Sequence, residues 1–288
     1  MSLRSRERTD RSGGKRAVRT GGGRAERAMV PPAEIRTYYD RPVLKQPVWR
    51  WYIPAYLFTG GVAGASSLLA LGARVTGNGR LARQSRLLSL GALAASSGLL
   101  IADLGRPERF YNMLRVLKPT SPMNVGSWLL SAFGGAVGTG VVCDLLGILP
   151  VAGGAADLGA ALLGPAVATY TAVLVADTAT PAWHEARREL PFVFAAGAAA
   201  GAAGLALALA PPSDAGPARA LLLGGAAAEL ASAELLRRRL DPDLAKTYSE
   251  GRAGGLSRLA RGLTAAGALA VAVGGRRRPV AIAGGVAV

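Results

Sequence analysis

Residues 125–149, VGSWLLSAFGGAVGTGVVCDLLGIL, decide the fold class because this long run carries a single charged residue, Asp144. A helix that crosses the hydrocarbon core of a bilayer needs roughly 20 apolar residues. Similar runs recur along the chain. The sequence therefore predicts an all-α, polytopic transmembrane helix bundle with seven full spans, at 53–73, 87–102, 125–149, 158–176, 192–210, 218–236 and 256–274.

An eighth helix is predicted to be incomplete. Beyond Arg276, Arg277 and Arg278 the chain offers only PVAIAGGVAV, which is about half of what a crossing helix needs. We therefore expect a short or truncated eighth helix.

Part of the net charge of +16 is concentrated at the N-terminus. Basic residues outnumber acidic ones in residues 1–28, and they alternate with Gly and Ser. This composition predicts a basic, disordered tail over residues 1–37 and a transmembrane domain over residues 38–288. The tail has no aromatic side chains to stack on bases, so we expect contact with membrane lipid and no nucleic-acid partner.

The chain has one cysteine, Cys143, and one histidine, His184. An iron–sulfur cluster takes several thiolates, a structural zinc takes four Cys or His ligands, and a two-haem cytochrome b needs about four axial histidines. The sequence therefore predicts no haem, no iron–sulfur cluster and no metal site in this chain. Any electrons must reside on partners or on a diffusible ligand.

Alternation of the spans assigns the loops to two faces. The N-terminal segment WRWYIP (49–54) and the loops after spans two, four and six share one face, here called face A. The other loops share face B, where TGNGRLARQSR (76–86) is the only well-charged linker. The chemistry of the protein is therefore predicted on face A.

A charged loop follows the second span on face A. Pro107 and Glu108 are predicted to start a short amphipathic helix that lies along the membrane interface. Asp103 and Arg106 are spaced so that a carboxylate and a guanidinium can pair across the turn before it. Such a pair either takes part in the chemistry or only braces the loop.

A second group of titratable residues follows the fourth span. His184 lies just beyond Asp177, and an imidazole beside a carboxylate can relay protons near neutral pH. The alternative is that the histidine is structural. Glu229 lies in the middle of the sixth run, where an ionisable residue is a functional candidate and is expected to be buried in the bundle. Asp144 and Asp157 are candidates for the same reason, with the alternative that they simply reach water, because they are close to span ends on face B.

Three stretches together resemble the NrfD/PsrC family, the membrane subunits of polysulfide-reductase-type oxidoreductases. They are YYDRPVLKQPVWRWYIPAYLFTGGVAGASSLLA (38–70), DLGRPERFYNMLRVLKPTSPMNVGSW (103–128) and YTAVLVADTATPAWHEARRELPFVF (170–194). The resemblance implies an eight-helix subunit without haem, located in the bacterial cytoplasmic (inner) membrane and serving electron transport in anaerobic respiration. It also implies a bound menaquinone or ubiquinone and two partners, a four-cluster ferredoxin-like iron–sulfur subunit and a molybdopterin catalytic subunit.

Carried over to this sequence, the resemblance implies a quinone site among the first three spans. A quinone carbonyl needs a hydrogen-bond donor, and the reduced form needs a proton acceptor. Some family members have a histidine near the start of the first helix, where this chain reads WRWYIPAY, so Asp103 or Tyr56 would have to replace it. The implied site residues are Trp51, Tyr52, Tyr56, Asp103, Arg106, Asn124 and Trp128.

Two other functions remain open from the sequence. A secondary transporter would move protons or ions through its membrane acids, but it would be expected to have related halves and helices broken near the midplane. No convincing internal repeat occurs, and the charged motifs cluster on one face. A purely structural membrane anchor would keep the partner and lack the quinone.

Overall fold

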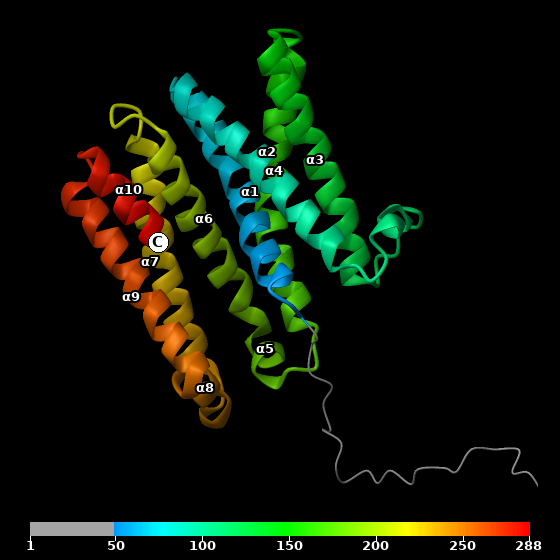
Figure 1. The fold of residues 1–288 in the computed structure, drawn as a ribbon, viewed down its shortest axis with the longest axis vertical. Helices are drawn as coiled ribbons and strands as arrows, with labels where there is room; N and C mark the ends of the chain where they lie inside the picture. The colour runs from blue at the N-terminus through cyan, green and yellow to red at the C-terminus, as the bar shows by residue number, and fades with distance from the viewer. Residues whose placement is uncertain (1–48) are drawn as a thin grey trace, which may run out of the picture. The chain divides into compact units, whose positions relative to one another are not determined.

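The computed structural model describes residues 49–288, and every regular element in that part of the chain is a helix (Figure 1). The all-α class is therefore confirmed. The basic tail predicted at 1–37 and the start of the transmembrane domain lie outside the described residues. Each predicted span corresponds to one long helix: α1 (Tyr52–Val75), α2 (Gly79–Asp103), α3 (Pro122–Leu146), α4 (Pro150–Ala176), α6 (Leu190–Leu209), α7 (Gly216–Arg239) and α9 (Gly251–Gly274).

Six of these helices are long and apolar enough to cross a membrane, namely α1, α2, α3, α4, α6 and α9. Helix α7 is not among them, because Glu229 and Glu234 interrupt its apolar sequence and three arginines end it. The chain is thus a multi-pass membrane bundle, but the predicted count of seven full spans is not confirmed. The predicted short eighth helix corresponds to α10 (Arg278–Ala287).

Helix α2 begins earlier than its apolar run, which was expected to start at residue 87. The side chain of Asn78 accepts a hydrogen bond from the backbone N–H of Leu81 at 3.1 Å and caps the helix. Arginine and leucine are good helix formers, so the charged linker continues into the helix instead of forming a loop. Its arginines are thereby fixed on a rigid element.

Helix α1 lies at the centre of the bundle, packed against α2, α4 and α6. Helix α3 packs on α2 and α4, while α7, α9 and α10 form a second group around α6. Consecutive long helices run in opposite directions, as alternation predicts (Figure 1). Face A therefore holds the start of α1 and the short helices η2 (Pro107–Leu114), α5 (Pro181–Glu185), η3 (Ala186–Arg188) and α8 (Pro242–Ser249).

Two glycines allow α1 and α4 to cross closely. A Cβ atom added to Gly64 would lie 2.3 Å from the carbonyl oxygen of Gly164, and one added to Gly164 would lie 2.4 Å from the carbonyl oxygen of Gly64. Near this crossing, the hydroxyl of Ser67 donates to the carbonyl of Ala160 at 3.0 Å. Close backbone contact between small residues is how helices associate where lipid supplies no hydrophobic drive.

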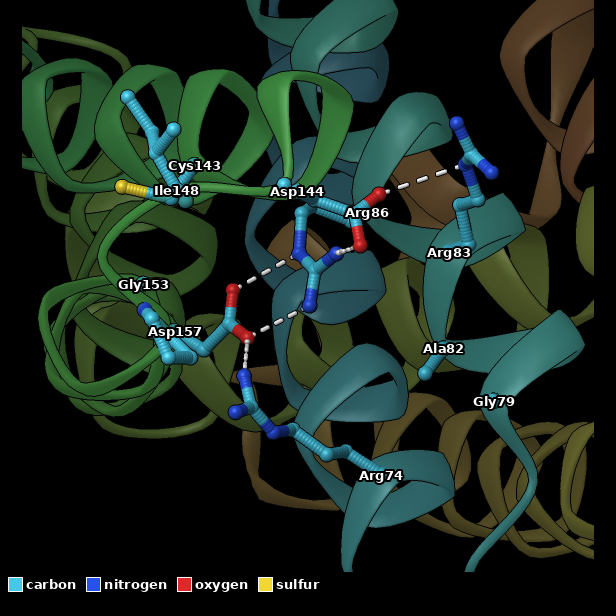
Figure 2. A pocket seen from close by; sticks show the side chains of 13 residues that line it. Arg74, Gly79, Ala82, Arg83, Arg86, Cys143, Asp144, Ile148, Gly153 and Asp157 are labelled. Atoms are coloured by element: carbon cyan, nitrogen blue, oxygen red, sulfur yellow. Dashed lines mark hydrogen bonds and ion pairs between the residues drawn. The ribbon is translucent and has the colours of Figure 1, made fainter.

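An ion cluster joins α1–α4 at their face B ends (Figure 2). Asp157 on α4 accepts two hydrogen bonds from Arg86 on α2, at 2.8 and 2.6 Å, and one from Arg74 on α1. Arg86 also contacts Asp144 on α3 at 3.0 Å, and Arg83 contacts the same carboxylate at 3.3 Å.

Burial separates Asp157 from the other carboxylate of this cluster. Its side chain is only 7% exposed, against 32% for Asp144. The alternative in which Asp157 simply reaches water is therefore wrong, because two arginines replace the water that its carboxylate would otherwise need. A buried charge is tolerated only when it is paired and hydrogen-bonded. The cluster thus fixes α4 against the α1–α2 hairpin.

We expect Asp157→Asn to destabilise the bundle by about 3 kcal/mol or more, because Arg86 would remain buried without its bidentate partner. An SDS titration of the purified protein would measure the free energy of unfolding. The matched control is Asp243→Asn, whose pair with Lys246 is exposed and should contribute less than about 1 kcal/mol. Equal effects of the two substitutions would contradict this account.

Candidate functional site

The predicted interfacial helix is present as η2, a 3₁₀ helix that begins at Pro107. Proline suits a first helical position because it has no N–H to satisfy and its φ angle is preset. Phe110, Met113 and Leu114 on η2 line a cavity together with residues of α2 and α3. The helix therefore covers the face A end of the groove between α2 and α3.

The cavity beneath η2 has a volume of about 240 Å³ and mostly apolar walls. Three serines interrupt these walls, one from α2 and two from α3. The remaining walls come from the same two helices and from η2. The lining residues are Leu93, Ser97, Leu100, Ile101, Phe110, Met113, Leu114, Ser127, Leu130, Ser131 and Gly134.

The three serines differ in their hydrogen bonds. Ser127 donates to the carbonyl of Met123 at 3.0 Å, and Ser131 donates to the carbonyl of Ser127 at 2.8 Å. Within the described part of the chain, Ser97 has no hydrogen-bond partner for its hydroxyl. A hydroxyl carries one donor and two acceptor sites, so Ser97 can donate to a ligand while all three can accept.

A second, smaller cavity lies beside the first, and Leu130 lines both. It is formed where Tyr56 on α1, Ser96 on α2 and Tyr170 on α4 meet, and its volume of about 10 Å³ corresponds to roughly one water molecule. The ring of Tyr170 packs against Gly126, where an added Cβ would lie 2.0 Å from the ring. Of the implied quinone ligands, only Tyr56 lines either of these two cavities.

Asn124 and Trp128 hold the loop after η2 onto α3. The side chain of Asn124 donates to the carbonyls of Met113 and Val116, each at 2.9 Å, and accepts from the backbone N–H of Lys118 at 2.6 Å. The indole of Trp128 donates to the carbonyl of Val116 at 3.4 Å. Both residues therefore position the cover of the larger cavity and do not line it.

Asp103 is the last residue of α2, and Arg106 precedes η2. Among the described residues no ion pair joins their side chains, so the predicted pairing across the turn is not observed. Asn124 braces the loop instead. Asp103 lies two residues beyond Ile101, which lines the larger cavity, and its side chain is partly exposed on face A.

Trp51 and Tyr52 stand at the start of α1, with their rings in contact at a centroid distance of 4.3 Å. Trp51 is 66% exposed, and neither residue lines the cavity beneath η2. Aromatic residues at this position are typical of the membrane interface. Their assignment to the quinone site stays a prediction.

The second predicted group lies elsewhere on face A. The Nδ1 atom of His184 is 3.1 Å from the carbonyl of Ala176, at the end of α4 and next to Asp177. This contact satisfies one of the carbonyls that a helix end leaves unpaired. This hydrogen bond supports the alternative that His184 is structural. Among the described residues, no contact joins His184 to Asp103 or Arg106.

Glu229 lines another cavity, of about 410 Å³, which lies between α1 and α4–α9. Trp49 and Trp183 stack at its wall with ring centroids 5.6 Å apart. Tyr248 on α8 also lines it, and burial raises the pKa of this phenol. Glu229 is partly buried in the bundle as expected, but it shares no cavity with the residues implied for the quinone.

Sequence reasoning missed the residues that complete the two cavities near η2. Ser97 and Tyr170 belong to apolar runs, and a single hydroxyl in such a run is common enough to carry no signal. The spacing of Ser127 and Ser131 places both on one side of α3, which is a helical pattern that could have been noticed. Tyr170 opens one of the stretches quoted above, but only the fold brings it to Tyr56.

Comparison with known proteins supports the resemblance in one part of the chain. The family model described as "Polysulphide reductase, NrfD" matches residues 42–138, about a third of the sequence. A comparison with curated proteins finds no match. The matched segment forms α1, α2, η2 and most of α3, and it includes every lining residue of the cavity beneath η2. The NrfD resemblance is therefore confirmed, and the segment that carries it builds this cavity.

Proposed function

We propose that this protein is the quinone-handling membrane subunit of a polysulfide-reductase-type oxidoreductase. The observation that carries the proposal is the cavity beneath η2, which combines apolar walls with three hydroxyls inside the NrfD segment. Ligand pockets are mostly apolar with a few placed polar groups, and typical volumes start at about 300 Å³. A cavity of about 240 Å³ suits a single ring system whose tail stays among apolar side chains or lipid.

The residues of the cavity fit a quinone headgroup. The hydroxyl of Ser97 is the candidate donor to one carbonyl, and Phe110 and Leu130 form apolar surfaces against the ring. A quinone bound here would accept or release two electrons and two protons. The protein's part is to hold the ring, to exclude water beneath η2 and to supply groups that exchange protons.

Asp103 is the proposed proton-exchanging group. It ends α2 next to the turn of helix that lines the cavity, and its side chain is partly exposed on face A. A carboxylate in this place can pass a proton between the cavity mouth and water. Arg106 adds a positive charge beside it, and Tyr56 with Tyr170 forms a polar wall behind Leu130.

The iron–sulfur partner is proposed to dock on face A. The loop around η2 carries exposed basic residues close to the cavity mouth, among them Arg109, Arg115 and Lys118. Charged rims steer association and fix the register of a complex. Docking there would bring a cluster near the proposed quinone, and a molybdopterin subunit would then join through the iron–sulfur subunit.

Ser97→Leu should fill the cavity and expel the quinone. We expect the quinone content of the purified protein to fall about tenfold or more, because leucine removes the hydroxyl that would bind the carbonyl and occupies the space of the ring. The content is measured by lipid extraction and chromatography. The matched control is Gly98→Leu on the same helix, because a Cβ at Gly98 meets open space. Unchanged quinone content in the Ser97→Leu protein would refute this location. A wild-type protein that retains no quinone would favour the purely structural anchor.

Asp103→Asn should lower quinol-coupled turnover of the complex by about 100-fold, the lower end of what a general acid–base group contributes. Assembly with the partner subunits should persist, because Asp103 makes no ion pair among the described residues that the substitution would break. Turnover is followed with a quinol analogue, and assembly is followed by co-purification. Glu108→Gln, an exposed carboxylate on η2, is the control. Equal turnover in the two variants would remove Asp103 from the mechanism.

A further inference from the structure

The ion cluster at face B also lines a cavity, on the opposite side of the bundle from η2 (Figures 1 and 2). Its volume is about 360 Å³, and Arg74, Arg83 and Arg86 line it together with Asp144 and Asp157. Three guanidinium groups face two carboxylates, so the lining carries a net positive charge. Nothing in the quinone proposal uses this cavity.

The arginines have hydrogen-bond donors to spare. Each of the three Arg86 nitrogens, Nε, Nη1 and Nη2, contacts a carboxylate oxygen. Among residues 49–288, Arg74 contacts a carboxylate through Nη1 alone, on Asp157, and Arg83 through Nε alone, on Asp144. A guanidinium has five N–H donors, so the outward groups of Arg74 and Arg83 remain available. Their side chains are 44% and 55% exposed.

An apolar tip stands beside the arginines. The end of α3, the turn that follows and the start of α4 expose large aliphatic side chains, while Ile148 lines the cavity itself. Exposure of such an apolar patch to water is unfavourable, whereas contact with lipid acyl chains is favourable. The exposed residues are Leu145 (54%), Leu146 (65%), Ile148 (46%), Leu149 (65%) and Val151 (85%).

We propose that this cavity binds the phosphate of an anionic phospholipid. The phosphate diester would accept hydrogen bonds from Arg74 and Arg83, for which the guanidinium fork is well suited. The acyl chains would lie along the apolar tip of the α3–α4 turn. The apolar tip favours a lipid over a soluble anion such as free phosphate, because only the lipid has acyl chains that can cover it. Arg86 and Asp157 form the rigid floor of the site.

The test uses the full-length protein in a neutral detergent at fixed ionic strength. Short-chain phosphatidylglycerol, short-chain phosphatidylcholine and inorganic phosphate are each titrated, and dissociation constants are measured by calorimetry. We expect phosphatidylglycerol to bind at least tenfold more tightly than the other two. Each arginine near an anionic lipid contributes about 1 kcal/mol, so Arg74→Gln with Arg83→Gln should weaken binding by about 10- to 30-fold.

Two controls separate charge at the cavity from charge in general. Arg276→Gln with Arg277→Gln removes two exposed charges from the α9–α10 turn on the same face, and should change the affinity less than twofold. Arg74→Lys with Arg83→Lys keeps the charge but loses the guanidinium fork, and its affinity should lie between those of the wild type and the glutamine variant. If the double glutamine protein unfolds, Arg83→Gln alone carries the test, because it loses only the 3.3 Å contact with Asp144. Equal binding by wild type and glutamine variant would overturn the proposal, and so would equally tight binding of inorganic phosphate.

Discussion

A buried carboxylate on α4 constrains the first half of the bundle. At 7% exposure the carboxylate of Asp157 needs hydrogen-bonding partners, and these come from α1 and α2. Arg86 passes the constraint on to α3 through Asp144. Ion pairs thereby connect four helices at one end. The Gly64–Gly164 contact in addition holds α1 against α4 by close backbone packing. The opposite ends of these helices are free to carry long loops.

The two ends of the same four helices therefore have different chemistry. At face B the polar groups pair with one another and stabilise the bundle. At face A the loop is held by the neutral amide of Asn124, and the cavity beneath η2 offers hydroxyls among apolar walls. Because the side chain of Asn124 fixes the loop, the loop does not need an ion pair between Asp103 and Arg106. That arrangement suits the proposed quinone site, which would exchange protons and receive a charged partner.

Sequence reasoning predicted the helices well because lipid demands long apolar runs, and it predicted η2 from the proline and the spacing of its apolar residues. It missed the ion cluster because Arg86 and Asp157 lie far apart in the sequence, and each could have reached water alone. It also missed Ser97 and Tyr170, since the cavities they line exist only once α2, α3 and α4 are packed. The hydrogen bonds by which Asn124 holds the cover of the cavity were also not foreseen, and its assignment to the quinone site stays a prediction. Such roles depend on contacts between elements, which periodicity does not report.

The early start of α2 has a consequence for depth in the bilayer. A helix of 25 residues is about 37 Å long at 1.5 Å per residue, whereas the hydrocarbon layer is about 30 Å thick. If α2 stands close to the bilayer normal and Asp103 marks one boundary, the surplus of about 7 Å lies at the other. The first turn and a half of α2 then belongs to the headgroup layer, and Arg86 stands just inside the hydrocarbon. On that placement, the arginine that would enter the hydrocarbon is the one with carboxylate partners on two other helices.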